Sequence, residues 1–208
     1  MPVGKALPLI NRWPSGAVGS YPQHVIINVV DIEATCWEKR PPAGHVSDII
    51  EIGLTVTDLA AGERLAKHKI LVRPERSTVS EFCTKLTGLT QAEVDRGMSF
   101  AEACQVLVTE HDATTRPWAS WGNYDRSQFL RQCEATGVSY PFGDVHVNAK
   151  TVFSSAYREN RAGRGMAAAL EAVGLPLEGR HHDGADDSWN IAALILHMSN
   201  AGNWPLAA

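Results

Sequence analysis

The stretch that decides the fold is His24-Val-Ile-Ile-Asn-Val-Val-Asp-Ile-Glu33, a β-branched run that ends on two acids. Preceded by Pro22, this run predicts a strand over residues 24–30 that is buried on both faces. Side chains alternate along a strand, so Asp31 and Glu33 point to the same side at its carboxyl end. Ligands of open α/β sheets usually bind at that end. We therefore expect a central strand with a functional pair of carboxylates, with two solvated acids as the ordinary alternative.

The segments that follow predict an α/β domain with a mixed sheet. Further strands are expected at residues 48–58, 67–72, 118–121 and 145–147, the first two joined by a turn in an antiparallel meander. Helices are expected at residues 79–87, 99–110, 125–135, 151–159, 166–173 and 187–198. Ser99 and Glu102 have the spacing of a capping box, and Gly137 is suited to end a helix.

The chain length of 208 residues fits one domain. Residues 1–23, interrupted by prolines and glycines, predict a loosely ordered arm ahead of a domain over residues 24–208. Because no apolar run reaches the length of a membrane span or signal peptide, we expect a soluble, cytoplasmic protein. The four cysteines lack the C-x-x-C spacing of a zinc site, so reduced thiols are expected.

The chain has 19 basic and 23 acidic residues, which give a net charge of −4. This charge excludes a uniformly basic surface that would bind the phosphates of nucleic acid over its whole extent. Any contact with nucleic acid must be local. One segment, with Lys150, Arg158, Arg161 and Arg164 opposed by Glu159, is locally basic. It either follows phosphates or forms an ordinary solvated helix face.

Two further segments carry chemistry. In His182-Asp-Gly-Ala-Asp-Asp187, the last acid begins an apolar helix, where capping and the helix dipole already favour an acid. They do not explain the histidine, whose pKa suits it to take a proton from water. The second segment is Trp121-Gly-Asn-Tyr-Asp125, in which Asp125 is a candidate functional acid. The ordinary alternatives to a functional role are helix capping by Asp125 and aromatic packing by Trp121 and Tyr124.

Together these segments supply four carboxylates and one histidine, each at the end of an expected element: Asp31, Glu33, Asp125, Asp187 and His182. Oxygen ligands without a thiolate suit Mg²⁺ or Mn²⁺ rather than Zn²⁺. Two such ions form the clamp used for in-line displacement at phosphorus. The set therefore predicts metal-assisted hydrolysis of a phosphodiester.

The same motifs, in the same order, resemble those of the DEDDh 3′–5′ exonucleases, which include RNase T and the proofreading subunit of bacterial DNA polymerase III. The matching motifs are Asp31-x-Glu33, Tyr124-Asp125 and His182-x-x-x-x-Asp187. The local sequence is similar to that of Eri-type exoribonucleases and bacterial KapD-like exonucleases in Val30–Cys36, Phe82–Gln91, Trp121–Asp125, Gly165–Leu170 and Gly174–His182. The resemblance covers about residues 24–200.

This resemblance implies an RNase H-like fold with a five-stranded mixed sheet flanked by helices. It implies release of nucleoside 5′-monophosphates from the 3′ end of single-stranded nucleic acid, RNA in preference to DNA. It assigns Asp31, Glu33, Asp125 and Asp187 as ligands of two Mg²⁺ ions, replaceable by Mn²⁺, and His182 as general base. By count alone His181 with Asp186 fits equally. The following Ser-Trp-Asn-Ile-Ala is similar to the end of the family's Asp-Asp-x-x-Asn-Ile-Ala motif, and this resemblance selects Asp187 and hence His182.

Substrate contacts are expected at Ala34, Thr35, Trp37, Leu86, Thr87 and Trp121, with core packing as the alternative for both tryptophans. Three other functions stay open: a DNA-trimming exonuclease, a non-catalytic nucleic-acid-binding module on the same fold, and a metal phosphoesterase for small nucleotides. Protein partners are not indicated, and both a monomer and a homodimer are compatible with the sequence.

Overall fold

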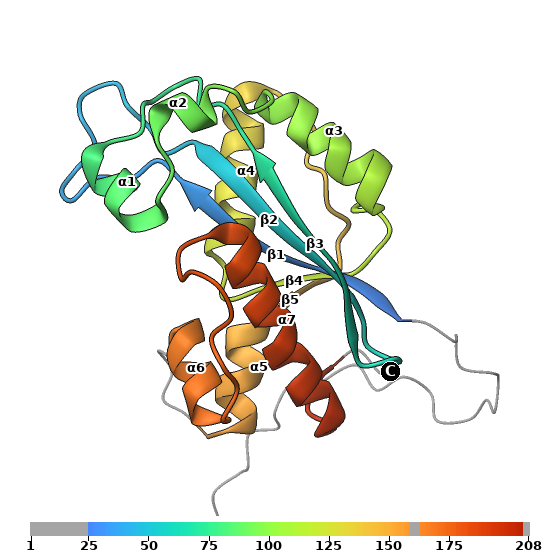
Figure 1. Ribbon diagram of the computed structural model, residues 1–208. Helices are drawn as coiled ribbons and strands as arrows, with labels where there is room; N and C mark the ends of the chain where they lie inside the picture. Colours follow the sequence, from blue (N-terminus) through green and yellow to red (C-terminus); the bar gives the residue numbers. More distant parts are fainter. Residues whose placement is uncertain (1–24, 159–162, 206–208) are drawn as a thin grey trace, which may run out of the picture.

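The computed structural model describes residues 25–158 and 163–205, so the predicted arm over residues 1–23 lies outside the described residues (Figure 1). The strands are β1 (Ile26–Ala34), β2 (Ile49–Asp58), β3 (Glu63–Leu71), β4 (Trp118–Ser120) and β5 (His146–Asn148). The helices are α1 (Glu81–Thr87), α2 (Gln91–Val94), α3 (Phe100–His111), α4 (Tyr124–Thr136), α5 (Ala149–Ala156), α6 (Met166–Ala172) and α7 (Gly184–Asn200).

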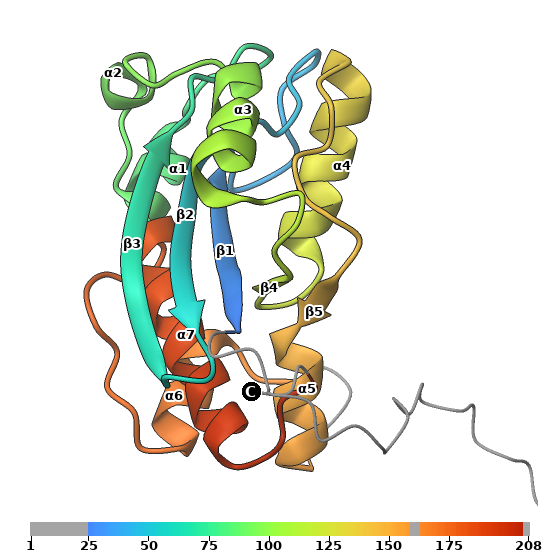
Figure 2. The ribbon, with the colours of Figure 1, turned by 90° about the vertical axis from the view of Figure 1, so that its right-hand side faces the viewer.

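The five strands form one sheet in the order β3-β2-β1-β4-β5. β1 pairs antiparallel with β2 and parallel with β4, while β3 extends the antiparallel side and β5 the parallel side. The predicted five-stranded mixed sheet, with β1 at its centre, is confirmed. Figure 2 shows α3 and α4 on one side of this sheet and α5, α6 and α7 on the other.

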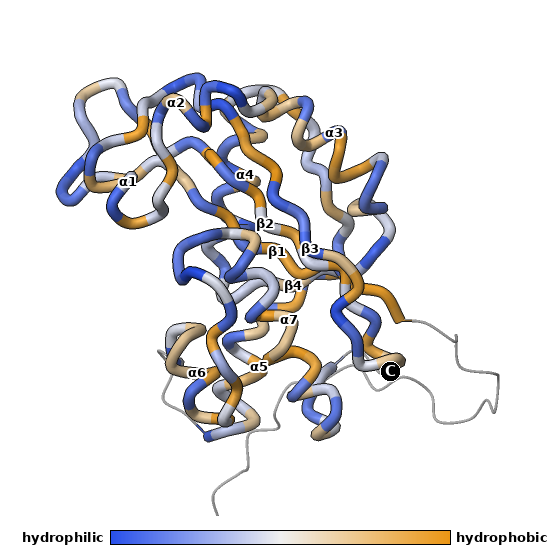
Figure 3. The backbone as a smooth tube through the Cα atoms, viewed as in Figure 1, coloured by the Kyte–Doolittle hydropathy of each residue, from blue (hydrophilic) through white to orange (hydrophobic). Residues whose placement is uncertain are grey.

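The two faces of β1 belong to two separate cores. Ile27 and Val29 pack with α5, α6 and α7, whereas Val30 and Ile32 pack with α3 and α4. Figure 3 shows the resulting concentration of hydrophobic residues along the central strands. Because side chains alternate along a strand, the next odd-numbered residues of β1 also face α7.

The start of α7 approaches the sheet closely at Gly53 of β2. A Cβ at Gly53 would lie 1.9 Å from the carbonyl oxygen of Gly184, so a larger residue there would displace the helix. This contact sets the distance between the first turn of α7 and the acids of β1.

Several boundaries differ from the sequence-based expectations. β1 continues to Ala34 because it keeps pairing with β2, so its two acids lie inside the strand instead of after it. α7 begins at Gly184 with Asp183 as N-cap, ahead of the expected start at residue 187. The short α2 was not expected. The predicted capping box at Ser99 and the helix end at Gly137 are confirmed.

The four cysteines are free thiols. In the part of the chain that the structure describes, none of the helices combines the length and the apolar character that crossing a membrane requires.

Candidate active site

Three carboxylates meet between β1 and the first turn of α7. Asp31 and Glu33 face α7, and Asp187 comes from that helix. One ligand oxygen from each lies within 4.8 Å of the others. Asp187 is 5% exposed, and its Oδ1 is buried without a hydrogen-bond partner among the described residues. A buried, unpartnered oxygen in a cluster of acids fits a hard divalent cation.

A fourth carboxylate approaches β1 from α4. Asp125 is 4% exposed, and its Oδ1 accepts a hydrogen bond of 3.0 Å from the backbone N–H of Ile32, the residue between the two strand acids. Its ligand oxygens are not within the 4.8 Å group of the other three. The hydrogen bond nevertheless fixes Asp125 beside that group.

Burial shifts the pKa values of all four acids upward, and repulsion from neighbouring carboxylates adds to this shift for Asp31, Glu33 and Asp187. Burial, followed by the charge of Asp125, raises the pKa of Asp31 well above its usual value. Burial is also the main reason why the pKa of Glu33 rises to about 8, that of Asp187 to about 7 and that of Asp125 to about 6. Full ionisation at neutral pH is therefore unfavourable without a counter-cation, which is the electrostatic condition of a metal site.

His182 stands beside Asp187 on a strained backbone. Its φ is 65°, and its backbone N–H donates to Asp187 Oδ2 at 2.9 Å. Partial burial, with the charges of His181 and Arg180, lowers the pKa of the His182 imidazole. A neutral imidazole at neutral pH has the free nitrogen that a proton acceptor requires.

The neighbouring histidine also lies near the cluster. The His181 ring stacks on His182 with centroids 4.0 Å apart, and its Nε2 is 3.8 Å from Asp187 Oδ2. His181, His182 and Asp187 form a second group with ligand atoms within 4.8 Å of one another. Both imidazoles are therefore within reach of Asp187.

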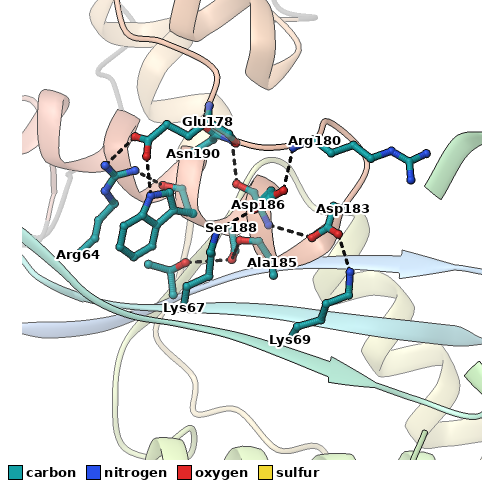
Figure 4. Close-up of polar contacts among 12 residues, drawn as sticks. Arg64, Lys67, Lys69, Glu178, Arg180, Asp183, Ala185, Asp186, Ser188 and Asn190 are labelled. Carbon is teal, nitrogen blue, oxygen red and sulfur yellow. Dashed lines mark hydrogen bonds and ion pairs between the residues drawn. The ribbon is translucent and has the colours of Figure 1, made fainter. Parts of the chain in front are cut away.

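The two adjacent acids of α7 have separate surroundings. Asp187 joins the acids of β1, whereas Asp186 faces basic and backbone donors. Its Oδ1 accepts from Lys67 Nζ at 2.7 Å and its Oδ2 from the Arg180 N–H at 2.8 Å (Figure 4). The structure thus brings Asp187, and not Asp186, to Asp31 and Glu33.

The expected substrate contacts fall into two groups. Ala34 ends β1 and Leu86 lies near the end of α1, where the Leu86 carbonyl accepts a hydrogen bond of 3.1 Å from Arg180. The hydroxyl of Thr35 is buried against Ser77, and that of Thr87 donates to the Cys83 carbonyl. Both hydroxyls are therefore engaged within the protein, and the backbone of Thr35 is engaged as well, because its N–H donates to the Asp48 carbonyl at 2.8 Å and its carbonyl accepts from Ser47 at 2.8 Å.

The two tryptophans also differ. Trp37 is half-buried and meets His45 edge to face, with ring centroids 6.1 Å apart. Trp121 packs against the core formed with α5, α6 and α7, contacts Phe153, and donates its indole N–H to the Arg164 carbonyl at 3.0 Å. Trp121 is thus engaged in packing, the alternative raised for it from the sequence. In the basic segment beside it, Arg161 lies outside the described residues.

Sequence reasoning missed Glu51. This residue lies on β2 opposite Glu33, is 0% exposed, and accepts a hydrogen bond of 3.0 Å from the Ala185 N–H through Oε1. Burial raises its pKa, which Lys69 partly opposes. The available signal was an acid within the apolar run Ile49–Leu54, a position that normally holds an apolar residue.

Comparisons with known proteins agree with this geometry. The RNase T family, described as "Exonuclease", matches residues 29–195. Rat 3′-5′ exoribonuclease 1 is 33% identical over 197 residues, covering 90% of this chain and 56% of that protein. The Drosophila melanogaster 3′-5′ exonuclease Snipper is 31% identical over 195 residues, covering 83% of this chain and 69% of that protein.

Among solved structures, the nuclease domain of 3′hExo, described as a DEDDh family member bound to rAMP, superposes with a TM-score of 0.78 at 29% identity. The match covers 86% of this chain and 94% of that one. The chain spans little more than half the length of rat exoribonuclease 1, 56% of it. Because the family match extends across most of the chain and includes all the acids of the site, this chain belongs to the RNase T family of exonucleases.

Proposed function

We propose that this chain is a metal-dependent 3′–5′ exoribonuclease that releases nucleoside 5′-monophosphates from single-stranded RNA. The observation that carries the proposal is the cluster of Asp31, Glu33 and Asp187 with its buried, unpartnered oxygen. The exoribonuclease name of the rat relative and the rAMP bound to the 3′hExo domain support RNA as the substrate.

DEDDh exonucleases depend on metal, and the acids of this site could bind it. We assign the ligands to Asp31, Glu33, Asp125 and Asp187, and the metal to Mg²⁺, with Mn²⁺ able to replace it, because hard oxygen donors suit these ions. Two such ions, when bound, supply the positive charge that favours water ionisation and departure of the 3′ oxygen.

His182 is the proposed general base. It accepts a proton from water while the water oxygen bonds to phosphorus and the bond from phosphorus to the 3′ oxygen breaks. The departing 3′ oxygen takes up a proton from solvent, so one nucleoside 5′-monophosphate leaves and the shortened strand ends in a 3′ hydroxyl. The lowered pKa of His182 supports this role, because it keeps the imidazole neutral at the pH of the reaction.

The terminal nucleotide is proposed to lie between the end of β1 and α1. Backbone groups at Ala34, Thr35 and the Leu86–Thr87 turn border this position, and the Trp37 ring would stack on a base. Trp121 is left out of the proposed contacts because its indole is engaged by Phe153 and Arg164.

The test uses 5′-labelled single-stranded RNA and DNA of one sequence, each incubated with Mg²⁺, Mn²⁺ or EDTA. We expect a metal-dependent RNA ladder that shortens from the 3′ end and is absent with Asp31→Ala. An equal or faster DNA ladder would support the DNA-trimming alternative. Cleavage of model phosphodiesters without a ladder would support the small-nucleotide phosphoesterase. Tight RNA binding without cleavage would indicate a non-catalytic module.

The choice of base is tested by comparing His182→Ala with His181→Ala on the same RNA. We expect His182→Ala to lose about 10²–10⁴-fold in turnover, the usual contribution of a general base, and His181→Ala to lose much less. The reverse order would transfer the role to His181.

A further inference from the structure

Three basic side chains of β3 lie on the face of the sheet that carries α7 (Figure 4). Lys67 and Lys69 share this face because they are two residues apart. A β-bulge leaves Leu65 without a partner in the register with β2, which turns Arg64 to the same face. We call Arg64, Lys67 and Lys69 the basic stripe.

Each member of the basic stripe pairs with an acid in the segment that carries His182. The pairs are Arg64 with Glu178 at 2.8 Å, Lys67 with Asp186 at 2.7 Å, and Lys69 with Asp183 at 2.5 Å. Ion pairs at the surface contribute little to stability by themselves. Their shared target therefore suggests that their role is to place one segment of the chain.

Asp183 links this stripe to His182 most directly, because the two residues are adjacent. Asp183 is the N-cap of α7, and its Oδ1 accepts a hydrogen bond of 3.2 Å from the Asp186 N–H. Its Oδ2 is held by Lys69. The Lys69–Asp183 pair thus fixes the position of Asp183, which lies between His182, with its left-handed backbone, and the first residue of α7.

Lys69 also faces the buried acid behind the site. Its Nζ is 3.2 Å from Glu51 Oε2, while Glu51 Oε1 accepts the Ala185 N–H. The side chain of Glu51 is 0% exposed and that of Asp183 is 19% exposed, so both negative charges are poorly solvated. Among the described residues, Lys69 is the cation placed against both, and it ties β2 and β3 to the first turn of α7.

We propose that Lys69 is a positioning residue for the hydrolysis proposed above, on which this inference rests. Its ammonium holds Asp183 and Glu51 and thereby keeps His182 in the backbone conformation that directs it toward the acid cluster. Without the ammonium, two neighbouring carboxylates repel each other and Asp183 can turn to solvent. The φ of 65° at His182, unfavourable for a residue other than glycine, would then lose its support.

The first experiment compares Lys69→Met, which keeps the length of the side chain, with Lys69→Arg, which keeps the charge. Arg116→Met, which removes the Arg116–Asp112 pair, is the matched control. We expect Lys69→Met to lower kcat roughly 10- to 100-fold, as a misplaced catalytic group does, with KM within about 2-fold. Lys69→Arg should restore most of the loss, and Arg116→Met should match the wild type.

A double-mutant cycle separates positioning of His182 from a general effect on the fold. If Lys69 acts through His182, Lys69→Met adds no further loss of kcat in a His182→Ala background. Fully additive losses would overturn the proposal, as would an unchanged kcat for Lys69→Met.

Amide hydrogen exchange, measured without RNA or metal, tests the same contact independently of activity. We expect Lys69→Met to speed exchange in residues 180–187, where the His182, Ala185 and Asp186 amides donate to side-chain acids, and Arg116→Met to leave it unchanged. If the wild type does not cleave RNA, the proposed function fails while this measurement still decides whether Lys69 holds the segment.

If Lys69→Met misfolds, Asp183→Asn breaks the same ion pair and keeps the cap. Wild-type exchange in that variant would overturn the proposal.

Discussion

The first turn of α7 and the remainder of that helix are held to the sheet by different contacts. The first turn meets β1 and β2 through carboxylates, ion pairs and the close approach at Gly53. Farther along, Ile191, Leu194 and Ile195 are each 0% exposed and pack in an apolar core. The same helix therefore has a first turn whose negative charges are unfavourable without a cation, and an apolar remainder whose burial stabilises the fold.

This difference indicates how the protein keeps such an acidic site. Four acids whose pKa values are raised reduce stability when they ionise. Burial of the apolar residues of α7 offsets that cost at about 25 cal/mol for each Å² removed from water. Substitutions at the two ends of the helix should therefore separate activity from stability.

The largest expected effect is on turnover at the acidic end. Asp187→Asn should lower kcat by about 10³-fold or more, because the amide keeps the acceptor for His182 and loses the charge that would hold metal. The melting temperature of the metal-free protein at pH 8 should stay the same or rise, because one repelling charge is removed. Asp112→Asn, which alters the Arg116–Asp112 ion pair after α3, is the control. Unfolding of Asp187→Asn would show that this acid is structural.

The apolar body of the helix predicts the opposite pattern. Leu194→Ala should lower the free energy of unfolding by about 2–5 kcal/mol, the cost of a buried leucine and the cavity that remains. At temperatures where the variant is folded, its kcat should stay close to that of the wild type. Denaturant unfolding and turnover of the same preparation check both statements. A large loss of kcat in fully folded Leu194→Ala would contradict the division between the two parts of α7.

The sequence predicted the strand and the helix that carry the acids better than it predicted the contacts that hold them together. The continuous β-branched run His24–Val30 predicted the central strand, and the two-residue spacing of its acids predicted their common face. The pairing of Lys69 with Asp183 joins residues 114 positions apart, and the bulge at Leu65 depends on how two strands pair. Such contacts follow from tertiary packing, which local periodicity does not encode.

The acidic end should also make stability depend on pH. The pKa of Glu33 is about 8 and that of Asp187 about 7 in the folded protein without metal, above values near 4 for unfolded acids. Because the folded state holds these protons more tightly, their stabilisation is complete below about pH 4 and is lost as pH rises through 7 and 8.

We therefore expect the melting temperature in EDTA to fall by about 4–8 °C between pH 7 and 9, for a loss of about 2 kcal/mol. Saturating Mg²⁺ or Mn²⁺ should reduce this fall, because the cation binds the ionised acids. Asp187→Asn should have a shallower slope in EDTA, since the charge of Asp187 is the neighbouring charge that raises the pKa of Glu33 most. If the melting temperature falls equally steeply with pH in the variant and the wild type, the acid cluster is excluded as the cause of the pH dependence.

The smallest expected effect on activity distinguishes Trp37 from Trp121, the two tryptophans that the sequence offered as substrate contacts. Trp37→Ala should raise KM for RNA by about 5-fold or more with little change in melting temperature, because base stacking contributes about 1–3 kcal/mol. Trp121→Ala should instead destabilise the fold by about 3 kcal/mol and change KM less, since its indole contacts Phe153 and Arg164. Steady-state kinetics and thermal unfolding of both variants provide the test. If Trp37→Ala lowers the melting temperature and leaves KM unchanged, Trp37 is a packing residue, and the bound RNA must be held by the backbone at the end of β1 and α1.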